Sequence, residues 1–95
     1  MAEKRDRPSI TVTDAGDGVL VVAGELDLAG AAILRRALAS AVAVSALDLR
    51  GVTFIDAAGL HALDDAAHLA LRAPSPAVGR LLDLVDQSER FAIES

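Results

Sequence analysis

Two aspartates stand directly after predicted strands, which is where a parallel sheet presents functional side chains. Asp27 follows the second predicted strand, residues 19–23, and Asp56 follows the third, which begins at residue 46. The carboxyl ends of parallel strands share one edge of the sheet, where ligands tend to bind. As a pair, these carboxylates could hold a divalent cation or act as acid and base. We favour a simpler interpretation, in which Asp56 caps a helix and Asp27 is a solvated turn residue.

A second group of potential ligands lies within one predicted helical stretch. It consists of His61, Asp64, Asp65 and His68. Spacings of i, i+4 and i+7 would place three of these side chains on one helix face, as a zinc site needs. The chain has only two His and no Cys to complete such a site. We therefore interpret the group as a solvated polar face, and we expect no metal and no cofactor.

The sequence also lacks a constellation for nucleophilic catalysis. Ser75 stands between Pro74 and Pro76, where a helix N-cap explains it better than a nucleophile. No glycine-rich phosphate-binding pattern is present. The backbone N–H groups of residues 57–59 could bind an anion, but Asp56 would use much of that capacity itself. We expect no catalytic residues, and hence no enzyme.

Length and charge narrow the class of protein further. The chain has 95 residues, enough for one domain, and a net charge of −5, which argues against partners as acidic as nucleic acid or an anionic membrane. No apolar stretch follows the charged N-terminus, and the longest charge-free run, residues 37–47, is far shorter than the ~18 residues of a membrane helix. These features predict a cytoplasmic protein without membrane insertion.

The apolar pattern predicts alternating strands and helices after an N-terminal hairpin. Residues 1–8 are expected to be a flexible arm, and residues 9–95 a single domain. Ile10 and Val12 mark a first strand, residues 14–18 a turn, and residues 19–23 a strand buried on both faces.

Two helices and a third strand follow. A helix is predicted over residues 31–42, with Gly30 as a permitted N-cap. A short strand is predicted over residues 46–49, and residues 51–55 continue toward the second helix. Asp56 caps the second helix, which has an apolar stripe. Residues 69–71 are predicted as a fourth strand, although a straight helix over residues 57–72 remains an alternative.

The last helix has the clearest signals. Ser75 and Pro76 begin it, and its apolar stripe is Val78, Leu81, Leu82 and Val85. Residues 91–93 form either a short strand or a packed end. The order β-β-α-β-α-β-α predicts an α/β domain with a mostly parallel sheet and helices packed on it. Seven residues are predicted to be core: Val21, Leu34, Leu38, Leu47, Leu49, Leu81 and Leu82.

Three segments together resemble one family. They are GELDLA at residues 24–29, LDLRGVTFIDAAGL at residues 47–60 and LALRAPSPAV at residues 69–78. In this order they look like the STAS domain of bacterial anti-sigma factor antagonists. The resemblance implies a regulatory protein-binding module that binds an anti-sigma factor with a kinase-like ATPase fold and so frees a sigma factor.

The family's regulatory motif is altered in this chain. The family motif reads Asp-Ser-Ser/Thr-Gly-Leu, and its first Ser is phosphorylated by the partner kinase. By resemblance, Asp56, Gly59 and Leu60 match the motif, whereas Ala57 occupies the phosphoacceptor position and Ala58 replaces the second hydroxyl residue. Alanine has no oxygen to accept a phosphoryl group, so the usual switch is expected to be absent. The connection from Leu60 to the fourth strand is also short, near the lower limit of about 10–12 residues for a crossover.

The resemblance places the partner surface in the loop after the second strand and in the first half of the second helix. Its residues are Asp27, Leu28, Ala29, Gly30, Asp56, Ala57, Ala58, Gly59, Leu60 and His61. Two alternatives stay open. One is a STAS subunit of a transporter or a signalling scaffold, and the other is a small-ligand or nucleotide sensor at the strand carboxyl edge. The sequence does not set the oligomeric state.

Overall fold

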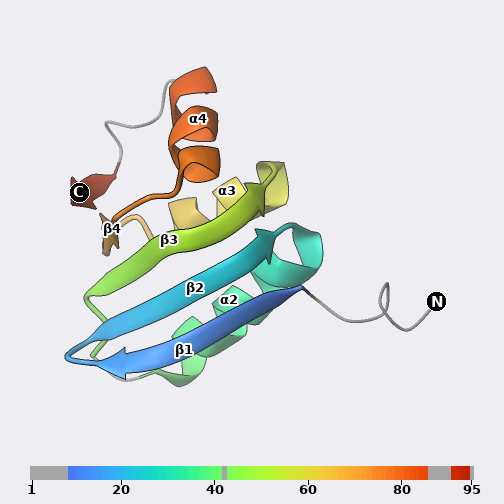
Figure 1. Cartoon of the computed structure of the whole chain (residues 1–95). Coiled ribbons are helices and arrows are strands. Elements are labelled where there is room, and N and C mark those ends of the chain that lie inside the picture. The colour runs from blue at the N-terminus through green and yellow to red at the C-terminus, as the bar shows by residue number, and fades with distance from the viewer. Residues whose placement is uncertain (1–8, 42, 86–90, 95) are drawn as a thin grey trace.

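A five-stranded sheet forms the centre of the molecule in the computed structural model, which describes residues 9–41, 43–85 and 91–94 (Figure 1). The strands are β1 (Ile10–Gly16), β2 (Val19–Leu26), β3 (Ala46–Ile55), β4 (Ala70–Arg72) and β5 (Ala92–Glu94). They lie side by side in chain order. Only β1 and β2 pair antiparallel, and the other neighbours pair parallel. The predicted α/β domain with a mostly parallel sheet is therefore confirmed. The predicted arm at residues 1–8 lies outside the described residues.

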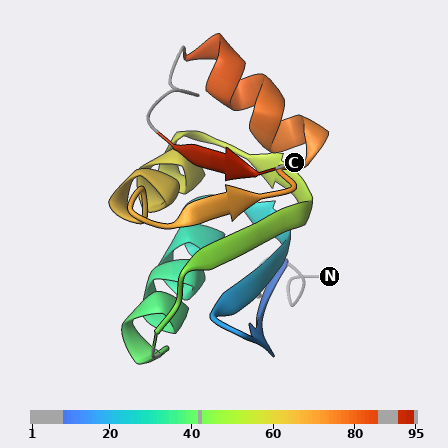
Figure 2. The same cartoon turned by 90° about the vertical axis from the view of Figure 1, so that its left-hand side faces the viewer.

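Helices cover both faces of the sheet. α2 (Leu28–Ser40) and α3 (Ala57–Asp65) lie side by side on one face, and α4 (Pro76–Leu84) packs along β3 on the other (Figure 2). α4 begins as the sequence predicts, because the Ser75 hydroxyl oxygen accepts a hydrogen bond from the N–H of Val78 and Pro76 occupies the first turn.

The connection after α3 settles the alternative that the sequence left open. α3 ends at Asp65 and two successive turns follow, in which Ala66 N–H bonds to the carbonyl of Leu63 and Leu69 N–H to that of Ala66. These turns reverse the chain and bring Leu71 into the core as part of β4. The alternative of one straight helix is wrong, because burying Leu69 and Leu71 beside β3 is incompatible with continuing α3.

The hairpin is confirmed, but the burial predicted for its second strand is wrong. Leu20 and Val22 of β2 are buried beneath α2, whereas Val19, Val21 and Ala23 on the opposite face are half-exposed. The reason is that α4 lies over β3 and leaves the outer face of the hairpin without a helix.

α2 begins three residues earlier than predicted. Its N-cap is Asp27 and not Gly30, which lies inside the first turn. The carboxylate is the better cap because it accepts a hydrogen bond from a free N–H of the first turn, which glycine cannot do. The helix ends at Ser40, and Val42, the predicted last residue, lies outside the described residues.

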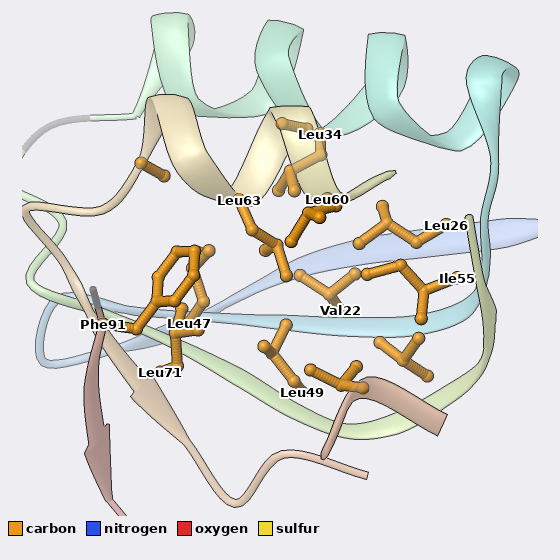
Figure 3. Packing of buried hydrophobic residues seen from close by; sticks show 14 of the residues in the cluster. Val22, Leu26, Leu34, Leu47, Leu49, Ile55, Leu60, Leu63, Leu71 and Phe91 are labelled. Atoms are coloured by element: carbon orange, nitrogen blue, oxygen red, sulfur yellow. The ribbon is translucent and has the colours of Figure 1, made fainter. Parts of the chain in front are cut away.

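Aliphatic side chains fill the core between the sheet and its helices (Figure 3). Four predicted core residues are fully buried, namely Leu34, Leu47, Leu49 and Leu82. Leu38 and Leu81 are only half-buried at its margin, and Val21 is half-buried on the outer face of the hairpin. Phe91 closes the core beside Leu71 and Leu47, and β5 follows it directly, so the tail is both a packed end and a fifth strand.

Candidate partner-binding surface

The two aspartates of the sequence analysis have the same structural role. Each stands in extended backbone at the end of a strand and caps the helix that follows. Asp27 Oδ1 accepts a hydrogen bond from Gly30 N–H at 2.9 Å, and Asp56 Oδ1 accepts one from Gly59 N–H at 3.2 Å. The interpretation of Asp56 as a cap is confirmed. The interpretation of Asp27 as a simple turn residue is wrong.

Both helices carry a glycine at the third position after the cap, for a steric reason. A Cβ added to Gly30 would collide with the carbonyl oxygen of Glu25, and a Cβ added to Gly59 would collide with that of Leu26. Each helix therefore starts pressed against the end of β2, which a larger residue would prevent. The pattern Asp-x-x-Gly, present at residues 27–30 and 56–59, is the local sequence signal for this packing.

This packing brings the two predicted segments together. β2 and β3 end in register, with Leu26 paired to Ile55, and the N–H of Asp56 lies 3.5 Å from the carbonyl oxygen of Leu26. Residues 27–30 and 56–61 therefore meet at one edge of the sheet, although 25 or more residues separate them along the chain. This edge is the carboxyl end of the parallel strands.

The exposed side chains of this edge differ from those that support it. Leu28 is 74% exposed, and Ala29, Ala57 and His61 are also exposed. Asp27, Asp56 and Ala58 are half-buried, and three residues are buried against the sheet, namely Gly30, Gly59 and Leu60. The accessible groups of this edge are therefore an apolar Leu, Ala methyl groups and an imidazole, together with two half-buried capping carboxylates.

The sequence reasoning missed a cleft of about 230 Å³ beside this edge, between the end of β3 and α4. Phe54, 47% exposed, and Leu84, 76% exposed, line it together with Arg80. Arg80 forms no ion pair with any residue that the structure describes. The available signal was that Phe54 is one of only two aromatic residues and stands two positions before Asp56. Exposed apolar groups of this size mark interaction surfaces.

Of the residues considered for metal binding, only His61 lies at this edge, and Asp65 and His68 lie toward the other end of α3. Asp65 forms an ion pair with Arg35 at 3.0 Å, and α3 ends there. His68 lies beyond the helix end, so the i, i+7 spacing from His61 does not place both on one helix face. Within residues 9–41, 43–85 and 91–94, no three His, Cys, Asp or Glu side chains are grouped to hold a metal ion.

The fold and this edge define the class of protein, and comparison with known families agrees. The STAS domain family matches residues 7–95, so the chain belongs to the STAS family. A search of curated proteins found no significant match. No helix among the described residues is long and apolar enough to span a membrane.

Two solved structures are similar to this chain. One is an anti-sigma factor antagonist from Mycobacterium paratuberculosis, with 29% sequence identity and a TM-score of 0.70 over 94% of this chain and 86% of that one. The other is the anti-sigma factor antagonist SpoIIAA in its unphosphorylated form, with 18% identity and a TM-score of 0.58 over 79% of this chain and 82% of that one. The second likeness supports the fold alone.

Proposed function

We propose that this protein is a cytoplasmic anti-sigma factor antagonist that binds an anti-sigma factor and thereby frees a sigma factor, without catalysing a reaction itself. The observation that carries the proposal is the similarity, over almost the whole chain, to a solved anti-sigma factor antagonist. The expected partner has the kinase-like ATPase fold that is typical of anti-sigma factors for this family.

The carboxyl edge and the cleft beside it form the surface that suits this role. Together they combine exposed apolar groups, Leu28 and Phe54, with the carboxylates of Asp27 and Asp56. Apolar anchors surrounded by polar groups are the usual composition of a protein–protein interface. Both carboxylates are held in place by their caps, so the edge is ordered before a partner arrives, which lowers the entropic cost of binding.

In this proposal the protein is not regulated by phosphorylation of the motif. Ala57 is exposed at the first position of α3, where a phosphorylated side chain would add roughly −1.5 to −2 charges to the centre of the surface. A methyl group adds neither charge nor bulk. The protein therefore stays competent for binding, and its abundance or another partner controls it.

The test measures binding of the purified chain to anti-sigma kinases of its source organism by calorimetry, with ATP present in a parallel sample. We expect binding without any change in intact mass. Ala57→Asp should weaken binding at least about tenfold, the equivalent of 1.4 kcal/mol, whereas Ala57→Ser should bind as the original does. Ala39→Asp, an identical change at an exposed position in the last turn of α2, is the control and should not alter affinity.

Two outcomes would contradict the proposal. Stoichiometric phosphate on the unmodified chain together with release of the partner would show that a switch exists at another residue, such as Ser75. Failure to bind any of the anti-sigma kinases would favour the STAS subunit of a transporter or scaffold.

A further inference from the structure

A cavity of about 460 Å³ opens between α2 and α3 at the end of the molecule away from the carboxyl edge. Four apolar residues line it: Leu38 in α2, Ala62 in α3, Ala66 at the end of α3, and Leu69 just before β4. The volume lies within the range of roughly 300–1,000 Å³ that is typical of small-molecule sites. The cavity does not overlap the partner-binding surface, which lies at the opposite end of α3.

The unequal lengths of the two helices explain why this space exists. α2 has 13 residues and α3 only nine, and both begin at the carboxyl edge of the sheet. The chain leaves α3 at Asp65, so the last turn of α2 has no helix beside it. The small side chains of Ala62, in α3, and Ala66, just after it, do not fill this space.

An ion pair stands among the residues that line the cavity and limits the ligands that fit. Arg35 Nε donates a hydrogen bond to Asp65 Oδ2 at 3.1 Å, and Nη2 lies 3.0 Å from the same oxygen. A guanidinium has five N–H donors, so at least three remain, and the second carboxylate oxygen remains as an acceptor. The pair is neutral as a whole, and it presents donors and an acceptor side by side.

The helix ends add to the case against an anionic ligand. The carboxyl-terminal ends of α2 and α3 both lie at this cavity, and such ends carry partial negative charge that disfavours an anion. The Arg35–Asp65 pair gives a cation no net attraction, because its two charges cancel. A neutral group that both accepts and donates hydrogen bonds, such as a carboxamide, matches the pair.

We propose that this cavity is a binding site for a small neutral amphiphile, whose apolar body fills the space over Leu38, Ala62 and Ala66 and whose carboxamide-like head bonds to the Arg35–Asp65 pair. The site is separate from the proposed partner surface, and its test needs no partner protein. Its outcome therefore does not depend on the proposed function.

The test uses three near-isosteric probes that differ in charge: benzamide, benzoate and benzamidinium. Each is titrated into the ¹⁵N-labelled full chain in the same buffer and at the same pH. Benzamide should shift the amide signals of Ala62, Ala66 and Leu69 in a saturable manner. The charged probes should bind about two- to fivefold more weakly, the range for charges half-exposed to water.

Two variants test the role of the ion pair through a change in which probe binds best, and not through a loss of binding. Arg35→Gln leaves Asp65 unpaired and should shift the preference to benzamidinium. Asp65→Asn leaves Arg35 unpaired and should shift it to benzoate. The two side chains are 44% and 66% exposed, so neither change should prevent folding. Absence of saturable binding, shifts centred on other residues, or one unchanged order of probes in both variants would overturn the proposal.

Discussion

Replacing Gly59 by alanine tests how the first turn of α3 is held against the sheet. In an unobstructed helix the change is stabilising by up to about 1 kcal/mol, because glycine loses more backbone entropy on folding. At Gly59 the new Cβ would collide with the backbone carbonyl of Leu26 and would lie 2.9 Å from Cγ1 of Ile55. Neither the carbonyl nor the packed strand end can yield without moving the start of α3.

The magnitude follows from these two opposing effects. Overpacking of this kind costs about 1–3 kcal/mol, and the propensity gain offsets about 1 kcal/mol of it. We therefore expect Gly59→Ala to lower the free energy of unfolding by up to about 2 kcal/mol, out of the roughly 5–15 kcal/mol typical of a domain. The displacement of α3 would also disturb the cap made by Asp56.

Gly79 in α4 provides a matched control. It is also a helical glycine, but nothing lies within 4 Å of an added Cβ. Gly79→Ala should raise the free energy of unfolding by about 0.5–1 kcal/mol. Urea denaturation of the two variants beside the original chain should move the midpoints in opposite directions. Equal stabilisation by both changes would refute the argument that the end of β2 forces a glycine at position 59.

Three further predictions are checked by the same urea denaturation. Ser75→Ala should cost about 1 kcal/mol, because it removes the cap of α4. Leu63→Ala, in the fully buried core, should lower the free energy of unfolding by about 2–5 kcal/mol. Leu84→Ala, at an exposed position, should change it by no more than about 0.5 kcal/mol. Similar losses at both positions would show that burial does not set the cost. Arg72→Ala breaks an exposed ion pair with Glu94 and should cost less than about 1 kcal/mol; a larger loss would mean that β5 depends on it.

Local signals were sufficient for most of the elements and for the motif. The start of α4 was predictable because its cap and first-turn proline act over three residues. The hairpin was predictable because its turn residues lie between two apolar runs. The segments at residues 24–29, 47–60 and 69–78 together predicted the family, which the comparison confirmed for residues 7–95. The start of α2 was also predictable in principle, since the Asp-x-x-Gly pattern at residues 27–30 repeats that at residues 56–59.

The errors arose where a residue's environment depends on distant parts of the chain. Val21 and Leu38 have core-like spacing, but Val21 lies on the hairpin face that α4 leaves uncovered, and Leu38 lies beside the cavity left by the short α3. Periodicity shows which residues share a face of an element. It does not show whether another element covers that face.

The sequence by itself determined most of the element order and the family, because these depend on residue identity and short spacings. Only the tertiary structure decided that the two Asp-x-x-Gly segments meet at one edge, that Phe54 and Leu84 line a cleft beside it, and that Arg35 reaches Asp65 across a cavity. The physical reason is that such contacts join residues up to 30 positions apart, and their geometry is set by helix lengths and strand register, which short-range patterns do not encode.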